Sequence, residues 1–452
     1  MPLDEHLFRR EYGRLVSSLT RIFGVHNLGL AEDAAQEAFC RALEAWSLRG
    51  VPDNPQAWLM ATARNRALDV IRRQRTAAGH APELEQAFRA GQNAEPAPDD
   101  PFLCGVMKDD LLRMMFACCD PRLPERTQIA LMLQILCGFS VGETAAAFLS
   151  GHAAMEKRLG RAKAVLATSR HLFDIAASPQ VVRRLPAVQR ALYLLFNEGY
   201  HGASAETSVR ADLCHEAMRL TALLLDDPRC ATPATHALGA VMCLHAARLP
   251  ARVDDAGHLI ALSEQDRTRW NRELVADGLA LLDLAATGPD LTGYHVEAAI
   301  AAIHAAAPDF HATDWGAIVT LYDRLIRLEP SPIVALNRAV AIALSSGPAQ
   351  GLAEIRAIPD RDRLATYPFY FAALGELECR SGNAEAARVH FRHAMGLARN
   401  PMERRYYADR LTLCDAGTRS VQSLEGMWDH ALEGLRAVLE RERATHSPRH
   451  GA

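Results

Sequence analysis

The sequence predicts an all-α protein, with two small helical domains followed by a larger domain of helical hairpins. Hydrophobic residues make up 49% of the chain, alanine and leucine dominate them, and β-branched residues are sparse, a composition that favours helices. Apolar residues recur at helical spacing in most segments. At 452 residues the chain is also too long for one hydrophobic core, which predicts several domains.

The formal net charge is −4, so evidence for a nucleic-acid partner has to come from local basic segments. Residues 1–24 lack the apolar core of a signal peptide, and no apolar run reaches the length of a membrane span. We therefore expect a soluble, cytoplasmic protein with no membrane partner. The ten cysteines form no CxxC pair and are predicted to be small buried hydrophobes.

The first domain is expected over residues 1–75, with helices over 5–23, 31–46 and 54–75. In the second helix, the side predicted to be buried carries Phe39, Ala42, Leu43 and Trp46 at helical spacing. The other side carries Asp33, Gln36, Glu37, Arg41 and Glu44. That polar side is either a solvated surface or a docking surface, and the helix alone does not distinguish the two.

The third helix is the most basic segment of the domain. Asn54 is predicted to cap it and Pro55 to be its first residue. One apolar side is expected to carry Ala57, Ala61, Leu68 and Ile71, and the five arginines are Arg64, Arg66, Arg72, Arg73 and Arg75. Together with Trp58 and Asn65 they are compatible with nucleic-acid binding and equally with a solvated surface helix.

Residues 76–106 are rich in alanine, proline and glycine and are predicted to be a linker, with a short helix between 83 and 90. A second helical domain is expected over 107–170. Its predicted helix over 124–137 buries Ile129, Met132, Leu133 and Leu136. Ser140 and Glu143 form a capping box that begins another helix.

A tight turn over 149–151, with Ser150 as predicted cap, leads to a basic helix over 152–166. Its inward stripe is Met155, Leu159, Ala162 and Leu166, and its outward side carries Ala153, Lys157, Gly160, Arg161 and Ala164. A helix, a tight turn and a basic helix indicate a helix-turn-helix. Two short helices joined by a turn are also common in helical proteins without DNA binding.

Residues 180–440 are expected to form a separate extension of helical hairpins. A pattern typical of tetratricopeptide repeats comprises Leu374, Gly375, Gly382, Asn383, Ala387, Phe391, Ala394, Leu397 and Pro401. A looser copy covers 331–358. Because this part should have its own core, deleting residues 180–452 is predicted to leave residues 1–170 folded.

Enzymatic function is not expected. His390 and His393 lie one helical turn apart, but no carboxylate completes a metal-ligand set, and no HExxH, phosphate-binding loop or nucleophile elbow occurs. We therefore predict no catalytic residue, no metal and no cofactor.

The order of these parts resembles extracytoplasmic-function (ECF) sigma factors. Residues 31–39, Ala-Glu-Asp-Ala-Ala-Gln-Glu-Ala-Phe, match the pattern of sigma domain 2, as do Trp58, Leu59, Ala63, Asn65 and Asp69. Residues 107–170 resemble sigma domain 4. The remainder resembles the ECF subgroup with a C-terminal tetratricopeptide-like extension.

The resemblance implies a role for each surface. Docking on core RNA polymerase would involve Asp33, Gln36, Glu37 and Arg41. Opening and binding of the minus-10 promoter element would involve Asn54, Trp58, Asn65, Arg66, Arg72, Arg73 and Arg75. Contacts to the minus-35 element would come from His152, Lys157, Arg158, Arg161 and Lys163. Gly151 and Ala154 depart from the family pattern in the turn and recognition helix, which are poor in base-reading side chains.

The extension is then expected to regulate the sigma domains, with a regulatory protein or peptide as a possible partner. The alternative from another functional class is a tetratricopeptide scaffold that binds protein partners without DNA.

Overall fold

The computed structural model describes residues 5–78, 110–136, 138–148, 150–168, 180–201, 211–252, 260, 262, 264–398 and 401–415. Every regular element within these ranges is a helix, which confirms the predicted all-α class. Residues 76–78 of the predicted linker are described. The rest of that linker, up to residue 106, lies outside the described ranges together with its predicted short helix. The described helices include none that is both long and apolar enough to cross a membrane.

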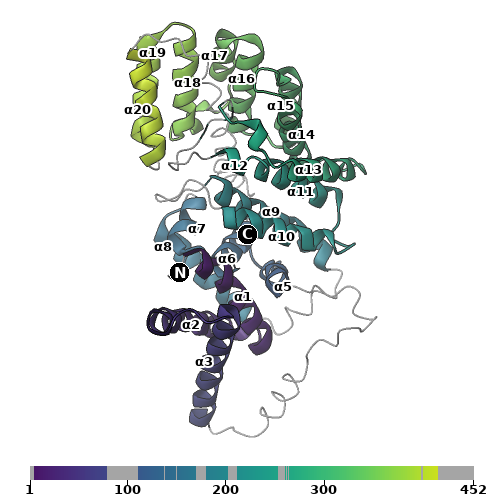
Figure 1. Ribbon diagram of the computed structural model, residues 1–452, viewed down its shortest axis with the longest axis vertical. Helices are drawn as coiled ribbons and strands as arrows, with labels where there is room; N and C mark the ends of the chain where they lie inside the picture. The colour runs from purple at the N-terminus through teal and green to yellow at the C-terminus, as the bar shows by residue number, and fades with distance from the viewer. Residues whose placement is uncertain are drawn as a thin grey trace, which may run out of the picture. The chain divides into compact units, whose positions relative to one another are not determined.

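The chain divides into two compact units. Unit 1 comprises Met1–Leu192 and Asp226–Cys230, and unit 2 comprises Tyr193–Leu225 and Ala231–Ala452. The helices of unit 1 are α1 (Glu5–Phe23), η1 (Val25–Asn27), α2 (Leu28–Arg49), α3 (Pro55–Ala78), α5 (Asp110–Cys118), α6 (Glu125–Leu136), α7 (Val141–Ala147), α8 (His152–Ala167) and the first half of α9 (Gln180–His201). Helix α1 packs against α2, α3, α5 and α6 (Figure 1).

Helix α2 is longer than predicted and its buried side is built mainly from alanine. Ala35, Ala38 and Ala42 have no exposed surface, and Phe39 and Trp46 complete this side. Leu43 was predicted to be buried with them, but 57% of it is exposed. The small alanines allow α1 and α3 to approach closely, and this fixes a rotation of α2 that leaves Leu43 at the edge of the contact.

The predicted apolar side of α3 is also rotated in the structure. Leu59, Ala63 and Ala67 are the fully buried residues, four apart along the helix, whereas Ala57 and Ala61 are exposed. Leu59 is the one large apolar side chain of this stripe, so its burial sets the orientation of α3 against α1 and α2. The predicted start of the helix is confirmed, because Asn54 Oδ1 accepts a hydrogen bond from Ala57 N at 3.0 Å.

Helices α7 and α8 pack against each other in the segment where a helix-turn-helix was predicted. Ser140 N donates to Glu143 Oε2 at 2.8 Å and Glu143 N donates to Ser140 Oγ at 3.1 Å, which confirms the capping box. The prediction that Ser150 caps α8 is wrong, since Gly151 is the N-cap and makes no side-chain bond. The inward stripe of α8 is confirmed: it consists of Met155, Leu159, Ala162 and Leu166.

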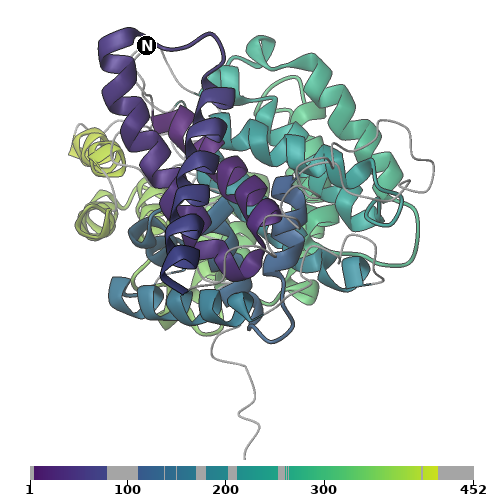
Figure 2. The same ribbon diagram turned by 90° about the horizontal axis from the view of Figure 1, so that it is seen from below.

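Unit 2 is a series of helices. They are α10 (Ala211–Leu225), α11 (Pro233–Ala246), α12 (Leu249–Arg252), η4 (Arg267–Arg269), α13 (Arg272–Ala285), α14 (Gly293–Ala306), α15 (Trp315–Leu328), α16 (Pro332–Ser346), α17 (Pro348–Arg356), η5 (Arg361–Leu364), α18 (Pro368–Arg380), α19 (Ala384–Leu397) and α20 (Pro401–Asp415). Helix α10 packs on α11, and the α-helices from α13 to α20 each pack on the next. Helices α19 and α20 lie side by side in Figure 1 and are seen end-on in Figure 2.

Residues of the predicted repeat pattern lie at the contact between α18 and α19. A Cβ on Gly375 would come within 3.1 Å of the Phe391 ring, so only glycine lets the ring sit directly on the α18 backbone. Ala387 and Ala394 are fully buried on either side of Phe391. Gly382 turns the chain between the two helices with φ of 86°.

The division between the units falls inside α9 and not near residue 180, where the extension was expected to begin. Val181, Leu185 and Val188 are buried, and Arg184 Nη1 donates to Phe116 O at 2.9 Å. Residues 180–192 therefore belong to the core of unit 1. A fragment that ends before α9 would expose this part of the core.

Seven cysteines of the described part of the chain form no disulfide bond. Cys118, Cys119, Cys214, Cys230 and Cys243 are buried as predicted. Cys40 lies exposed on α2, contrary to that prediction, because it occupies the polar side of the helix.

Candidate nucleic-acid interface

The predicted docking residues lie on the exposed side of α2. Asp33, Gln36 and Arg41 are exposed and Glu37 is half-buried. Arg41 Nη2 lies 2.9 Å from Glu37 Oε1, and Arg66 Nε of α3 lies 3.4 Å from Glu37 Oε2. Glu37 therefore links a predicted docking residue to a predicted DNA-binding residue.

Two leucines that the sequence reasoning missed share this side of α2. Leu43 is 57% exposed and Leu48 is 85% exposed. At 100° per residue, both lie on the half of the helix that carries Asp33 and Glu37. Leu48 was missed because the helix was expected to end at Trp46, whereas it continues to Arg49. A face that mixes charges with exposed leucines is typical of protein docking surfaces.

The exposed side of α3 brings together residues that the sequence showed only as separate features. Trp58, Asn65 and Arg72 follow one another at intervals of seven, opposite the buried Leu59 stripe, so they lie on one side of the helix. Trp58 packs edge-on against Trp46 of α2, with ring centroids 5.5 Å apart. This contact holds the indole of Trp58 in place at the N-terminal end of the row.

The cationic part of α3 lies beyond this aromatic contact. The Arg72 side chain is 75% exposed, and its contact with Asp69 is long, at 3.9 Å. Arg73 is also exposed, while the side chain of Arg75 lies outside the described part of the chain. Arg66 is held by Glu37 at the level of α2. The four arginines of α3 whose side chains are described therefore differ in environment, and Arg72 and Arg73 are the exposed ones among them.

The outward side of α8 carries His152, Lys157 and Arg161, which are all exposed. A Cβ on Gly160 would meet no heavy atom within 4 Å, so the helix backbone is accessible at that point. Arg158 is half-buried at the edge of this side. A backbone with so little cover can approach a phosphate or the wall of a groove closely.

Lys163 does not lie with these residues. Its Nζ forms an ion pair with Glu32 Oε1 of α2 at 2.7 Å, and it lies next to the buried stripe of α8. Burial raises the pKa of Glu32, and the attraction of Lys163 opposes that shift. In the structure Lys163 therefore lies apart from the other predicted minus-35 residues, because the rotation of α8 directs this side chain towards α2.

The C-terminal end of α8 is held by Arg122. Its guanidinium pairs with Asp120 at 2.7 Å and donates to Thr168 Oγ1 at 3.0 Å and to Val165 O at 3.2 Å. The hydrogen bonds from Arg122 hold the pKa of Asp120 below its ordinary value. The turn before α6 thereby anchors the last turn of α8.

The two histidines considered as metal ligands stack on an aromatic ring. His393 lies 5.0 Å from the centroid of Phe371 and His390 lies 6.4 Å from it. Burial lowers the pKa of His390. Within the described ranges, no three metal-ligating side chains converge on one point.

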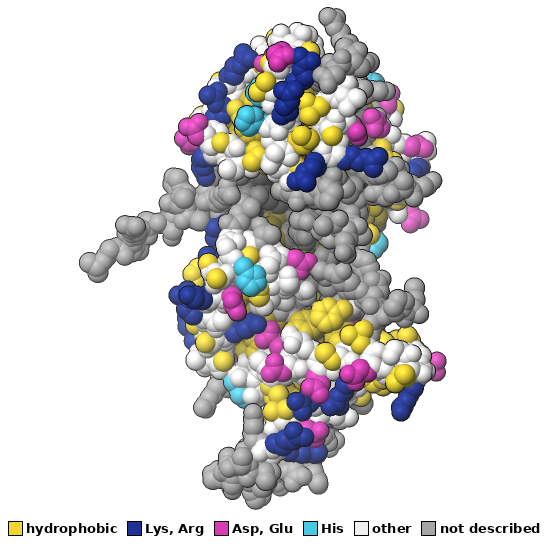
Figure 3. Space-filling view, turned by 90° about the vertical axis from the view of Figure 1, so that its left-hand side faces the viewer, with side chains coloured by type: hydrophobic (Ala, Val, Ile, Leu, Met, Phe, Trp, Pro, Cys, Tyr) yellow, Lys and Arg dark blue, Asp and Glu magenta, His cyan; other side chains and the backbone are white. Residues whose placement is uncertain are grey.

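On one face of the molecule, charge alone does not mark a binding surface. On the face shown in Figure 3, Lys and Arg side chains are interspersed with Asp and Glu side chains. The candidate interface is therefore defined by the orientation of α2, α3 and α8, and not by a continuous basic band.

Comparison with known proteins identifies two segments of the chain and a relative. Residues 7–77 match Sigma-70 region 2, and residues 184–286 match a family of unknown function (DUF6596). An uncharacterized protein of Rhizobium meliloti (strain 1021) is 41% identical over 392 residues, which cover 86% of this chain and 91% of the relative. No solved structure matches the chain.

The region 2 match covers α1, α2 and almost all of α3, the helices that carry the predicted docking residues and the row of Trp58, Asn65 and Arg72. Sigma-70 region 2 indicates binding to RNA polymerase and promoter recognition. The chain belongs to the same family as the Rhizobium meliloti protein, and it is a sigma-70 family factor in which a DUF6596 domain follows region 2.

Proposed function

We propose that this protein is a promoter-recognition subunit of the ECF type, which binds core RNA polymerase, opens promoter DNA and is regulated by its C-terminal extension. The observation that carries the proposal is the region 2 match over the three helices that present the docking side of α2 and the Trp58 row of α3. A subunit of this kind acts through binding and carries out no chemistry of its own.

Helix α2 supplies the docking surface in this proposal. Asp33, Gln36 and Arg41 give it polar specificity, while Leu43 and Leu48 give it apolar area that water covers in the free protein. Burying two exposed leucines against a partner stabilises a complex by roughly 1.5–3 kcal/mol for each fully buried side chain. The leucines are therefore proposed as the main source of affinity for the polymerase.

Helix α3 supplies promoter opening. An extruded base needs a stacking surface and an edge partner, and the row from Trp58 to Asn65 offers an indole and an amide on one side of the helix. Arg72 and Arg73 lie further along and are proposed to contact backbone phosphates. Capture of the base is thus assigned to the part of α3 with Trp58 and Asn65. Affinity for the DNA backbone is assigned to the part with Arg72 and Arg73.

Helix α8 is proposed to enter the major groove at the minus-35 element, with His152, Lys157, Arg158 and Arg161 in reach. Its outward side is otherwise small, with Ala153, Gly160 and Ala164. We infer that α8 contributes more to position on DNA than to base readout.

The extension is proposed to regulate unit 1 and to bind a regulatory protein or peptide. Consecutive packing of α14 to α20 resembles a solenoid, and the glycine–phenylalanine contact of Gly375 with Phe391 supports a tetratricopeptide-like repeat. A fragment of residues 1–192 retains the Arg184–Phe116 contact, so it is the suitable truncation for testing this role.

The test is transcription in vitro with purified core polymerase and promoters selected from random DNA by the holoenzyme. The variant Leu43→Ala/Leu48→Ala is expected to weaken core binding at least tenfold. The matched control is Val182→Ala, which alters an exposed apolar residue of unit 1 on α9. Absence of core binding by the full chain at low salt would refute the proposal and favour a scaffold that binds other proteins.

A further inference from the structure

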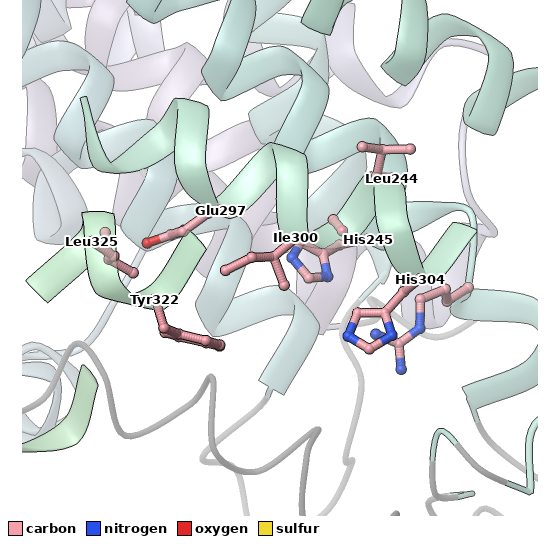
Figure 4. Close-up of a pocket in the computed structure, with 9 residues that line it drawn as sticks. Leu244, His245, Glu297, Ile300, His304, Tyr322 and Leu325 are labelled. Atoms are coloured by element: carbon pink, nitrogen blue, oxygen red, sulfur yellow. The ribbon is translucent and has the colours of Figure 1, made fainter. Parts of the chain in front are cut away.

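Unit 2 contains a small pocket between α11, α14 and α15, and Glu297, His304 and Tyr322 are among its lining residues (Figure 4). Its cavity volume is about 10 Å³, which leaves room for one water molecule. The pocket is therefore too small for an organic ligand.

In unit 1, a single carboxylate contacts two arginines that are predicted to serve different partners. Glu37 Oε1 lies 2.9 Å from Arg41 Nη2 on the same helix, and Glu37 Oε2 lies 3.4 Å from Arg66 Nε on α3. Arg41 is predicted to dock on the polymerase, whereas Arg66 is predicted to contact the minus-10 element. The cluster of Glu37, Arg41 and Arg66 therefore joins the predicted docking surface to the predicted DNA-binding surface.

This cluster keeps a net positive charge. The two guanidinium groups share one carboxylate, each through a different oxygen atom, so one positive charge is left over. The side chains of Arg66 and Glu37 are 30% and 35% exposed. A phosphate group can therefore approach the cluster from solvent and is attracted to it.

The contact with Glu37 leaves the tip of the Arg66 guanidinium available. The contact is made by Nε, and neither terminal nitrogen of Arg66 forms a hydrogen bond or an ion pair with another described residue. A carboxylate that served only to neutralise Arg66 would be expected to form the bidentate pair that these two groups favour. Contact through Nε instead holds the side chain and leaves two amino groups for a phosphate oxygen.

The packing of α3 on α2 has other, stronger sources than this ion pair. Leu59 and Ala63 of α3 and Ala38 of α2 have no exposed surface. A partly exposed ion pair at 3.4 Å adds little to stability by comparison. Its larger effect is on DNA binding, because an arginine that is already held in one orientation loses less side-chain entropy when it contacts a phosphate.

We propose that Glu37 is a positioning residue for promoter DNA: it holds Arg66 with its terminal amino groups directed to a backbone phosphate of the minus-10 region, and Arg41 in turn holds Glu37. This role rests on the proposed function and is additional to the predicted docking role of Glu37. One side chain of α2 then contributes to polymerase docking and to DNA binding.

The test compares holoenzymes formed at a core polymerase concentration that saturates each variant, so that a change in docking does not enter the result. Filter binding to a selected promoter is measured over a salt series. Removing a negative charge near DNA ordinarily strengthens binding. For Glu37→Gln we expect the opposite, which is about threefold weaker binding and a smaller salt slope, because Arg66 is no longer held.

Glu44→Gln is the matched control. Glu44 is an exposed acid of α2 whose carboxylate forms no ion pair with another described residue. This variant should bind promoter DNA as well as the wild type or slightly better, with an unchanged salt slope. In the background of Arg66→Gln, the further change Glu37→Gln should not weaken binding again, because the residue that Glu37 positions is already lost.

The melting temperature, followed by circular dichroism, separates positioning from a merely structural role. Weaker binding with lower stability and an unchanged salt slope would identify Glu37 as a structural bridge and overturn the proposal. Stronger promoter binding by Glu37→Gln would also overturn it, because Glu37 would then compete with DNA for Arg66.

Glu37→Asp is the second variant if Glu37→Gln does not fold or does not bind core polymerase. It keeps the charge but shortens the side chain by one methylene group, and it should show the same smaller salt slope. If the wild-type holoenzyme binds no promoter, the proposed function itself fails. That outcome is distinguishable, because it is observed before any variant is compared.

Discussion

Helices α3 and α8 carry similar numbers of basic residues, but these residues lie in different environments in the two helices. In α3, Arg72 and Arg73 lie exposed beyond the part of the helix that packs on α2. In α8 the cations are divided, with Lys157 and Arg161 facing solvent and Lys163 paired to Glu32. The buried stripe decides this division, because it sets the rotation of each helix about its axis.

The comparison shows that the count of basic residues in a helix does not give the number of cations that the helix presents to solvent. A lysine on the same helix as two exposed cations can serve tertiary structure instead. The five predictions below test how α3 and α8 differ, beginning with the largest expected effect.

Removing the exposed cations of α3 should weaken promoter binding more than any other change considered below. For Arg72→Gln/Arg73→Gln we expect the holoenzyme to bind a selected promoter about 30-fold more weakly, since two phosphate contacts are lost. The slope of log affinity against log salt should fall by about 1.5 to 2. Filter binding over a salt series measures both. Arg183→Gln, an exposed arginine of unit 1 on α9, is the control, and an equal loss in that variant would contradict the assignment.

Removing the anchor of α8 should destabilise that helix. Asp120→Asn loses the charged partner of Arg122, and we expect a local loss of about 1.5 kcal/mol. Hydrogen exchange of α8 in the full chain measures this as faster exchange, while exchange of α3 should not change.

This anchor also predicts a pH dependence. Because the pKa of Asp120 is lowered in the folded state, its contribution is fully present above the unfolded carboxyl pKa of about 4 and is lost as the pH falls through the folded value. The difference in exchange between wild type and Asp120→Asn should be constant above about pH 5 and shrink below pH 4. A difference that grows on acidification would contradict the ion pair.

The outward cations of α8 should have a smaller effect on promoter binding than those of α3. For Lys157→Gln/Arg161→Gln we expect about fivefold weaker binding at a promoter with both elements, because α8 offers few base-reading side chains. On a promoter whose minus-35 element is scrambled, the variant and the wild type should bind about equally. A larger loss of promoter affinity than in Arg72→Gln/Arg73→Gln would contradict the expectation that α3 contributes more than α8.

The smallest effect on DNA is expected at Lys163. Lys163→Gln should leave the salt dependence of promoter binding unchanged and reduce the stability of unit 1 by about 0.5–1 kcal/mol, as is usual for a partly exposed ion pair. A double-mutant cycle with Glu32→Gln checks whether the two side chains interact. A decrease of about 1 in the salt slope would show that Lys163 contacts a phosphate after all.

The pattern of the sequence predicted most of the helices, because their signals are local. Asn54 and Pro55 define the start of α3, and Ser140 with Glu143 defines the start of α7, through hydrogen bonds that span one turn. The stripe of α8 was also predictable, since its three large apolar residues, Met155, Leu159 and Leu166, leave one possible buried side.

Alanine-rich helices were predicted less well. In α2 and α3, alanines occur on several sides of the helix. Periodicity does not identify the buried side when neighbouring sides are similarly hydrophobic. The stripe of α3 was therefore misplaced towards Ala57 and Ala61, and Leu43 was placed in the core. The candidate site changed accordingly, since Leu43 and Leu48 joined the docking side and Trp58, Asn65 and Arg72 formed one row.

By itself, the sequence determined the helical class, the order of the parts, the capping residues and the resemblance of residues 1–75 to a sigma domain, because these depend on residues close together in the chain. Only the tertiary structure decided that Lys163 faces Glu32, that Glu37 joins α2 to Arg66, that α9 completes unit 1, and that Arg248, Glu297 and His304 surround a pocket. These features depend on how helices rotate and pack against partners far away in sequence, and no local pattern encodes that rotation.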